Sequence, residues 1–302
     1  MKKRVHSTII SLLFIFTLIG SGILFMSPPL ITMGDNEEPV QEQPDQNSPA
    51  VTGKHVIIHL TTMNLELKDG TTTLQTIPLV SQGKPGSYYE TIGGLHPTDY
   101  KIPLHFSSIG HVYMPYSVHL FGNYFIHGIP YYPNGEKVSS AYSGGCIRLA
   151  DDDAKILYAF VERGTPIIIT RGTDNDFLPT LPVTSTITSM DMTNTMVAAI
   201  SLEALTQDNE ILNTDETTMT TRRKLLPELL TQGDVRVSHL YANSIGKENF
   251  INLMNQKAKA LGLTSTTFTN LDDPVTTSQE DLERFTSYIS TYKSYINKVG
   301  NK

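Results

Sequence analysis

Apolar and polar residues alternate along residues 53–172, whereas the apolar residues of 188–302 recur at helical spacing. Alternation with a period of two predicts half-buried strands, and a period of about 3.6 predicts amphipathic helices. Residues 173–187 between these segments are rich in Thr, Pro and Asp, which is typical of a linker. We therefore expect a multidomain chain, with a mainly β domain over 53–172 and a small, mostly α domain over 188–302.

Turn residues and short apolar runs divide the first domain into elements. A hairpin turn is expected at residues 68–70, and a helix is expected to begin at Asp151. Asp151, Asp152 and Asp153 predict an N-cap and a negative first turn, and Gly164 predicts the end of this helix. The predicted strands are 55–60, 73–80 (the hairpin partner of 55–60), 112–120, 124–127 and 165–170.

Helical periodicity marks five segments of the second domain. They are residues 196–205, 225–230, 237–242, 250–263 and 282–296. The connections between them are rich in Thr. On this pattern alone, the second domain is a small helical domain.

An uncharged apolar run follows the short basic tail formed by residues 1–8. The run covers residues 9–26, close to the roughly twenty residues that a helix needs to cross a bilayer. A cleavable signal peptide is the alternative, but no convincing small-x-small cleavage site follows the run, so an uncleaved signal anchor is favoured. The basic tail before it and the acidic stretch at 35–38 after it predict a single-pass cell-membrane protein with its domains on the extracytoplasmic, cell-wall side.

Residues 27–52 are rich in Pro, Gln, Asn, Asp and Glu, which predicts a disordered spacer between the membrane and the first domain. The formal net charge of the chain is −7. Basic runs occur only in the N-terminal tail and at residues 222–224. This charge distribution argues against nucleic acid as a partner.

The chain contains a single cysteine, Cys146, so it forms no intramolecular disulfide. An isolated thiol is either a small buried hydrophobic group or a nucleophile. His127 can accept a proton from the thiol, and the glycines Gly144 and Gly145 allow backbone amides to approach a developing oxyanion. Arg148 lies on the same face as Cys146 in an extended chain and offers a fork for a carboxylate. The set indicates nucleophilic catalysis by a cysteine.

The motif formed by these residues has a recognisable spacing. Gly128 follows His127, and fifteen residues, 128–142, separate His127 from Ser143. Residues 143–148 then read Ser143-Gly144-Gly145-Cys146-Ile147-Arg148. This arrangement, over residues 53–172, resembles the L,D-transpeptidase catalytic domain family, which cross-links bacterial peptidoglycan. Gly144 departs from the pattern, because many members of that family have histidine there.

The resemblance implies a cysteine-dependent acyl transfer. Cys146 would attack the third residue of a stem peptide and expel the terminal D-Ala, with His127 as general base and then acid. The Gly128 carbonyl would orient the His127 ring, the Gly145 amide would bind the oxyanion, and Arg148 would position the donor. Stem peptides would be both donor and acceptor. The candidate substrate-binding residues are Ser143, Gly144, Tyr113, Tyr116 and Tyr142; for the tyrosines, packing between strands is the alternative.

A metal site is a second interpretation of the histidines. Seven of the nine histidines lie between residues 55 and 127. His55 and His59 share one face of a strand, and Cys146 could complete a site. No compact ligand pair has the spacing of a zinc hydrolase, so we expect neither a metal nor another cofactor.

The second domain has a fainter resemblance, to the serine-type D-alanyl-D-alanine carboxypeptidases, carried by residues 250–263 and the stretch after them. Asp191 and Asn194 stand where the Ser and Lys of that family's first motif belong, and residues 232–234 (Gln-Gly-Asp) stand in place of its second. A Lys-Thr-Gly motif is absent from this region of the sequence. The resemblance implies an inactive helical scaffold, a stem-peptide binder or a docking surface without penicillin-sensitive activity.

Three functions are consistent with the sequence. The leading hypothesis is a membrane-anchored L,D-transpeptidase that forms 3→3 cross-links. The second is an L,D-carboxypeptidase that trims the same stems with the same Cys146. The third is a non-catalytic peptidoglycan-binding protein.

Overall fold

The computed structural model describes residues 51–172, 186–205, 211–213 and 219–300. The predicted anchor at 9–26 lies outside these residues and stays a prediction, as do nearly all of the two predicted linkers. No helix in the described part has the length and apolar character needed to cross a membrane. All of the described residues belong to one compact unit.

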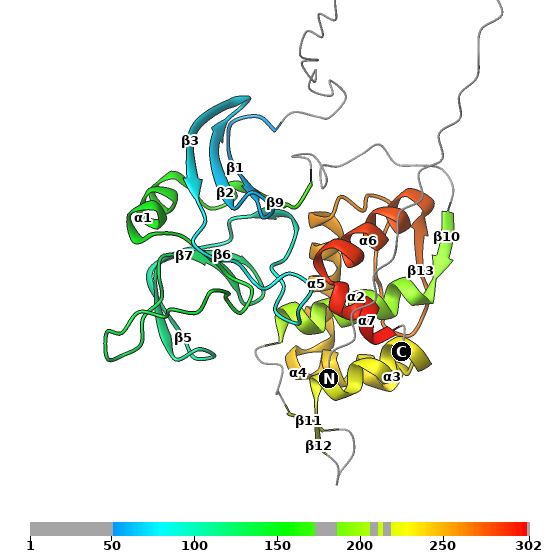
Figure 1. The fold of residues 1–302 in the computed structure, drawn as a ribbon. Helices are drawn as coiled ribbons and strands as arrows, with labels where there is room; N and C mark the ends of the chain where they lie inside the picture. Colours follow the sequence, from blue (N-terminus) through cyan, green and yellow to red (C-terminus); the bar gives the residue numbers. More distant parts are fainter. Residues whose placement is uncertain (1–50, 173–185, 206–210, 214–218, 301–302) are drawn as a thin grey trace, which may run out of the picture. The chain divides into compact units, whose positions relative to one another are not determined.

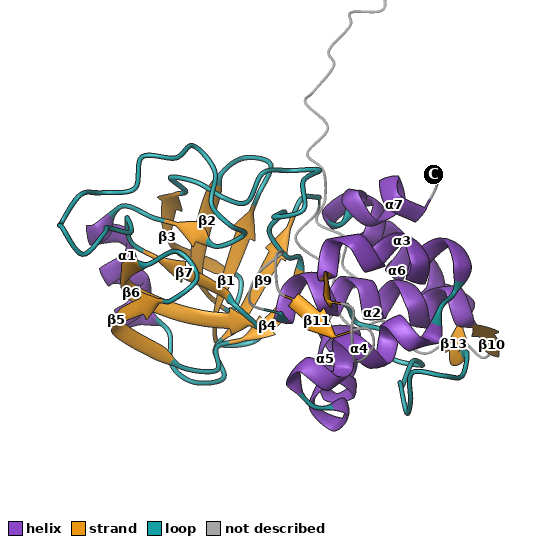
Figure 2. Cartoon of the chain, turned by 90° about the horizontal axis from the view of Figure 1, so that it is seen from below, coloured by secondary structure: helices purple, strands orange, loops and turns teal. Residues whose placement is uncertain are grey.

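The first part of this unit is mainly β with one helix, as the alternating pattern predicts (Figures 1 and 2). One sheet has the strand order β3-β2-β1-β9-β4, and a second has the order β5-β6-β7-β8. Helix α1 packs against β6 and β7. The elements are β1 (Lys54–His59), β2 (Asn64–Asp69), β3 (Thr72–Pro78), β4 (Gly94–Pro97), β5 (Lys101–Ser107), β6 (Val112–Phe121), β7 (Tyr124–His127), β8 (Ile147–Arg148), α1 (Asp151–Phe160) and β9 (Pro166–Thr170).

Strand β2 corrects the predicted pairing of the first strands. The prediction joined 55–60 directly to 73–80, but β2 lies between them and pairs antiparallel with both β1 and β3. Its alternation is short, because only Leu65 and Leu67 point into the core while their neighbours are at least partly exposed. The turn at Gly70 therefore joins β2 to β3.

Helix α1 begins where the acidic run predicts but is capped differently. The N-cap is Ala150, without a side-chain hydrogen bond, so the predicted aspartate cap is wrong. The Asp151 carboxylate instead accepts hydrogen bonds from the Ile129 amide and from Nζ of Lys137, both at 2.8 Å. The helix ends at Phe160, earlier than the predicted stop.

The second part of the unit is mostly helical, as predicted. The run predicted at 282–296 forms two helices instead of one, because the helix is interrupted at Lys293. The elements are β10 (Thr186–Ser189), α2 (Met190–Ala204), β11 (Ile211–Asn213), β12 (Met219–Thr221), α3 (Arg222–Gln232), α4 (Val235–Ile245), α5 (Lys247–Ala260), β13 (Val275–Ser278), α6 (Gln279–Tyr292) and α7 (Ser294–Gly300). Strands β10 and β13 form one two-stranded sheet, and β11 and β12 form another.

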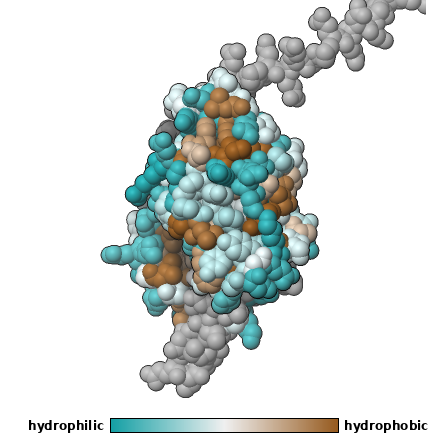
Figure 3. All heavy atoms as spheres, turned by 90° about the vertical axis from the view of Figure 1, so that its left-hand side faces the viewer, coloured by the Kyte–Doolittle hydropathy of each residue, from teal (hydrophilic) through white to brown (hydrophobic). Residues whose placement is uncertain are grey.

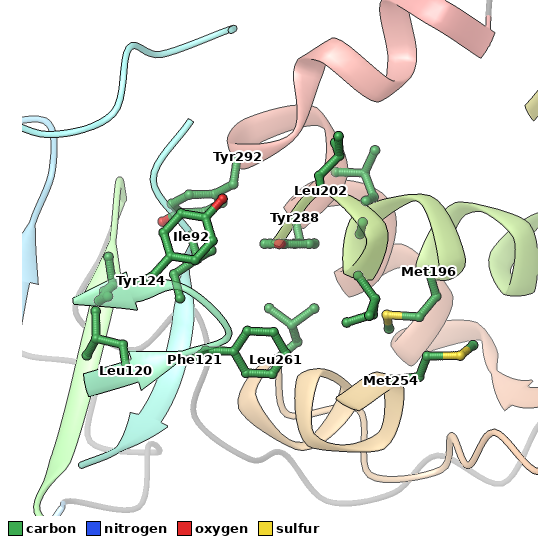
Figure 4. Close-up of a cluster of buried hydrophobic side chains, with 14 of the residues drawn as sticks. Ile92, Leu120, Phe121, Tyr124, Met196, Leu202, Met254, Leu261, Tyr288 and Tyr292 are labelled. Atoms are coloured by element: carbon green, nitrogen blue, oxygen red, sulfur yellow. The ribbon is translucent and has the colours of Figure 1, made fainter. Parts of the chain in front are cut away.

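One hydrophobic core spans both parts of the unit. Leu120, Phe121 and Tyr124 of the β part enter the same buried cluster as Leu202 of α2 and Tyr288 of α6 (Figure 4). The sequence left open whether the helical region packs on the β part. The shared core shows that the two parts fold against each other.

The surface of the β part carries scattered apolar side chains. Figure 3 shows one face, where apolar patches alternate with hydrophilic ones. Exposed hydrophobic residues include Leu74 of β3, Phe106 of β5 and Ile156 of α1. Exposed apolar side chains of this kind are ordinary for a folded domain.

A fully buried carboxylate lies among the helices at the junction of the two parts. Glu203 of α2 is paired with Lys257 at 2.7 Å and with Lys293 at 3.3 Å, and it accepts a hydrogen bond from the Tyr288 hydroxyl at 2.5 Å. Burial alone would raise the pKa of Glu203, but the two lysine charges and the hydrogen bonds outweigh it and lower the pKa to about 2. Nζ of Lys257 also lies 4.7 Å from the ring centre of Phe121 in the β part.

We predict that Glu203→Gln lowers the free energy of unfolding by about 3–5 kcal/mol, because it leaves two buried lysine charges uncompensated. Urea unfolding at neutral pH measures this loss. The Glu203 carboxylate has a lowered pKa when folded, so its contribution is present above the ordinary value of 4.5 and is lost as the pH falls towards 2. The variant should therefore lose less stability than the wild type between these pH values.

Lys247→Met is the matched control, because it breaks an ion pair that is about half exposed, with Asp272 at 3.8 Å. Exposed pairs contribute about 0–1 kcal/mol, so this variant should stay close to the wild type. Equal losses in the Glu203 and Lys247 variants would contradict a stabilising role for the buried cluster.

Candidate active site

The parallel pairing of β7 with β8 aligns the predicted catalytic residues. His127 is the partner of Arg148 in this pairing, and Ile126 is the partner of Ile147. Side chains alternate between the two faces of a strand, so His127 and Arg148 share one face. Cys146, two residues before Arg148, comes to the same face.

These residues line one cavity of about 440 Å³. Cys146, His127 and Arg148 lie in its wall together with Ser143 and Gly144. Further wall residues come from the loop before β4, from the β5–β6 connection, from the β6–β7 hairpin and from the helical part. They include Tyr88, Tyr89, Ile109, Asn123, Tyr124, Leu202, Leu205 and Arg222.

His127 is almost fully buried, and its ring is fixed by its neighbour. Nδ1 of His127 lies 2.6 Å from the Gly128 carbonyl oxygen, the contact that the resemblance implies. A carbonyl only accepts, so Nδ1 carries a proton, and Nε2 is left able to take one. Burial lowers the pKa of His127 to about 4, and the Arg148 and His105 charges act in the same direction. The ring is therefore a neutral base at neutral pH.

The thiol of Cys146 is also neutral at neutral pH. Burial raises the pKa of Cys146, and the opposing effects of the Phe125 amide and the Arg148 charge do not cancel it. The thiol donates to the Asn123 carbonyl oxygen, 3.7 Å from Sγ. Formation of the thiolate thus requires that a base take the proton as the sulfur attacks.

The loop before Cys146 depends on a glycine at position 145. Gly145 has φ +114°, and a Cβ there would lie 2.2 Å from the ring of Tyr124. Its amide donates to Oγ of Ser143 at 3.0 Å, so the predicted oxyanion amide at Gly145 is already engaged in this geometry. The Ser143 hydroxyl in turn donates to the Cys146 carbonyl at 2.5 Å. Although Ser143 lines the cavity, its hydroxyl holds the loop together.

Arg148 combines burial with spare hydrogen-bonding capacity. Its Nη1 donates to the carbonyl and the hydroxyl of Ser140, both at 3.1 Å. Its Nε is buried and has no hydrogen-bond partner among the described residues. A buried guanidinium with an unused donor beside a thiol is suited to hold an anionic group of a substrate.

The three tyrosines predicted to bind substrate lie outside the wall of the Cys146 cavity. Tyr113 stacks on Tyr131 with ring centres 5.5 Å apart, Tyr116 packs beside Tyr158 of α1, and Tyr142 is 49 % exposed. None of the three lines the Cys146 cavity. For Tyr113 and Tyr116, packing within the β part, the alternative given with the prediction, describes their position.

Sequence reasoning missed the cavity residues that come from distant segments. Leu202, Leu205 and Arg222 belong to the helical part, which the sequence treats as a separate domain. Arg222 is 2 % exposed and donates from Nε to the Tyr88 hydroxyl at 2.6 Å. The one available signal was the basic run beginning at Arg222, because such a run is unusual in an acidic chain.

The segments that resemble a carboxypeptidase lie close to each other. Nδ2 of Asn194 is 3.5 Å from the position that a Cβ on Gly233 would take. Neither residue lines the Cys146 cavity. The resemblance itself stays a prediction.

His55, one of the histidines in the metal interpretation, is engaged with the backbone. Nδ1 of His55 lies 2.9 Å from the Gly53 carbonyl oxygen. Across the residues that the structure describes, no three His, Cys, Asp or Glu side chains are placed to hold a metal ion.

A comparison with protein families found a match within the β part. Residues 53–169 match the family model of the L,D-transpeptidase catalytic domain. The search of curated proteins found no match.

Several solved structures are similar to part of the chain. An L,D-transpeptidase from Stackebrandtia nassauensis is 23 % identical with a TM-score of 0.35, covering 43 % of this chain and 61 % of its own. One from Mycobacterium smegmatis is 22 % identical with a TM-score of 0.32, covering 39 % and 58 %. A fused Zn-dependent amidase/peptidase/peptidoglycan-binding domain-containing protein from Clostridium acetobutylicum is 26 % identical with a TM-score of 0.34, covering 41 % and 54 %. The match thus spans less than two thirds of these proteins.

We predict that Gly145→Ala lowers the free energy of unfolding by about 2 kcal/mol or more, because the new methyl group meets the Tyr124 ring and the backbone has a positive φ. Gly144→Ala is the matched control, since nothing lies within 4 Å of its Cβ position. That variant should stay within about 0.5 kcal/mol of the wild type. Urea unfolding of both variants measures the difference, and similar stabilities would show that the loop does not require glycine at position 145.

We also predict that alkylation of Cys146 by iodoacetamide accelerates with pH and is still accelerating at pH 9.0, the ordinary pKa of the thiol. The thiolate is the reactive form, and the raised pKa keeps it scarce at neutral pH. Cys146 is the only cysteine, so the mass gain that a Cys146→Ala control lacks reports its modification. A rate that is already constant between pH 6 and 8 would reveal a preformed thiolate and contradict the neutral pair.

Proposed function

Because residues 53–169 belong to the L,D-transpeptidase catalytic domain family, we propose that this chain is a cysteine-dependent L,D-transpeptidase acting on peptidoglycan stem peptides. The observation that carries the proposal is the meeting of Cys146, His127 and Arg148 in one cavity. Strand pairing brings the base and the nucleophile to the same face of one sheet. A family match without these residues would support only the fold.

Acylation begins with two neutral groups. Nε2 of His127 takes the thiol proton as Sγ of Cys146 attacks the carbonyl carbon at the L-centre of the third stem residue. The protonated ring then gives its proton to the amine of the leaving D-Ala, the C–N bond breaks, and a thioester remains. The Arg148 guanidinium positions the donor through an anionic group of the stem.

The acceptor decides the product. The side-chain amine of a neighbouring stem attacks the thioester, transfers a proton to His127 and releases the thiol with a 3→3 cross-link. Water in place of the amine gives the alternative function, L,D-carboxypeptidase. Both reactions use the same residues, so the products distinguish them.

We further place the enzyme on the extracytoplasmic side of the cell membrane, anchored by residues 9–26. The support is the sequence pattern of a basic tail, an uncharged apolar run and an acidic spacer. This location gives the catalytic domain access to stem peptides as donor and acceptor.

We predict that the full-length chain, incubated with a tetrapeptide-stem muropeptide, gains the mass of the stem minus D-Ala in intact mass spectrometry. Cys146→Ala is the control and should show no adduct, because it lacks the nucleophile. An adduct that persists in the variant would overturn the assignment of Cys146. Binding of the muropeptide without any adduct in the wild type would favour the non-catalytic alternative.

Product analysis with and without an acceptor amine completes this test. A transpeptidase should form the amide-linked product when the amine is present and little free tripeptide. Tripeptide as the main product under both conditions would identify the carboxypeptidase instead.

A further inference from the structure

Two backbone groups of one hairpin contact the nucleophile. The thiol of Cys146 donates to the Asn123 carbonyl oxygen, 3.7 Å from Sγ, and the nearby Phe125 backbone acts to lower the pKa of the thiol. Asn123 lies in the turn between β6 and β7, and Phe125 is the second residue of β7. The position of this turn therefore sets the surroundings of Sγ.

The C-terminal end of helix α2 holds this turn. The Asn123 amide donates to the Glu203 carbonyl at 3.4 Å, and Nδ2 of Asn123 donates to the Ala204 carbonyl at 3.1 Å. The last carbonyls of a helix have no partner within the helix, so Asn123 satisfies two that would otherwise lack one. A Cβ on Gly122 would lie 2.4 Å from the backbone carbonyl oxygen of Glu203, which shows how closely the turn and the helix end approach.

The end of α2 is itself held in place by the buried charges. Glu203 is held by Lys257 and Lys293, and all three side chains are at most 1 % exposed. Lys293 also donates to the Glu90 carbonyl at 3.2 Å, and its Nζ lies 5.5 Å from the ring centre of Tyr124. These contacts join the charge cluster to Tyr124, which lines the Cys146 cavity, and to the loop before β4.

We propose that the helical region positions the nucleophile, with Asn123 as the positioning residue that connects the end of α2 to the backbone groups around Cys146. Asn123 acts through the turn and does not take part in the chemistry. For its effect on acyl transfer, the proposal rests on the proposed function. Its effect on the thiol is independent of that function.

Removing the Asn123 side chain tests the connection. Asn123→Ala deletes the bond to Ala204 and loosens the turn, so water gains access to a thiol whose pKa is raised mainly by burial. Alkylation of Cys146 by iodoacetamide at neutral pH should become severalfold faster, and its pH profile should move to lower pH. Formation of the acyl-enzyme should slow on the order of tenfold to a hundredfold, because the sulfur is no longer held against the base.

Asn255→Ala is the matched control. Nδ2 of Asn255 likewise donates to a backbone carbonyl, that of Phe268 at 2.9 Å, but within the helical part and away from the cavity. Loss of this bond should lower stability without changing the alkylation profile or the acylation rate. Asn123→Leu is a second variant of similar size, which removes the donor without adding a charge and should behave like Asn123→Ala.

Opposite changes in alkylation and acylation in a folded Asn123 variant would support the proposal. Folded Asn123 variants whose alkylation profile matches that of the Asn255 control would overturn it. If the wild type forms no acyl-enzyme, the proposed function fails, while the alkylation profiles still decide the positioning role.

Discussion

The carboxylate of Glu203 is the buried charge on which the junction of the two parts depends. An isolated carboxylate in the protein interior is strongly unfavourable, and here Lys257, Lys293 and the Tyr288 hydroxyl compensate it. Lys257 comes from α5, and Lys293 lies just beyond α6. Helices α5 and α6 must therefore be in place for α2 to bury its end against the β part. The helical region is thus fixed where the end of α2 contacts the turn between β6 and β7.

The chemistry of the cavity follows from the same exclusion of water. Burial lowers the pKa of His127 and raises the pKa of Cys146, so neither group is charged at neutral pH. In the proposed reaction, a neutral base and a neutral thiol require that proton transfer accompany the attack of the sulfur. They also leave Arg148 as a cation beside the nucleophile, where it can attract an anionic donor. The walls that exclude water come partly from the helical region, so the fold and the reactivity of the thiol are linked.

The sequence predicted the parts of the site that depend on local spacing. His127 and Cys146 are nineteen residues apart and lie on or beside adjacent strands, so the motif and the strand periodicity sufficed to place them together. The sequence could not show that the Gly145 amide donates a hydrogen bond to the Ser143 hydroxyl, because that depends on the loop geometry. Nor could it show that Arg222 enters the cavity, because this contact joins two segments that the linker composition separates.

The turn between β6 and β7 and the helical region form one structural unit. Native-state hydrogen exchange of the full-length chain, followed at residues 122–127 and at 200–204, tests it most directly. We predict that amides of the turn and of the end of α2 exchange with the same opening free energy, and that denaturant lowers this free energy equally for both. Protection of the turn that persists after the end of α2 has opened would contradict the account.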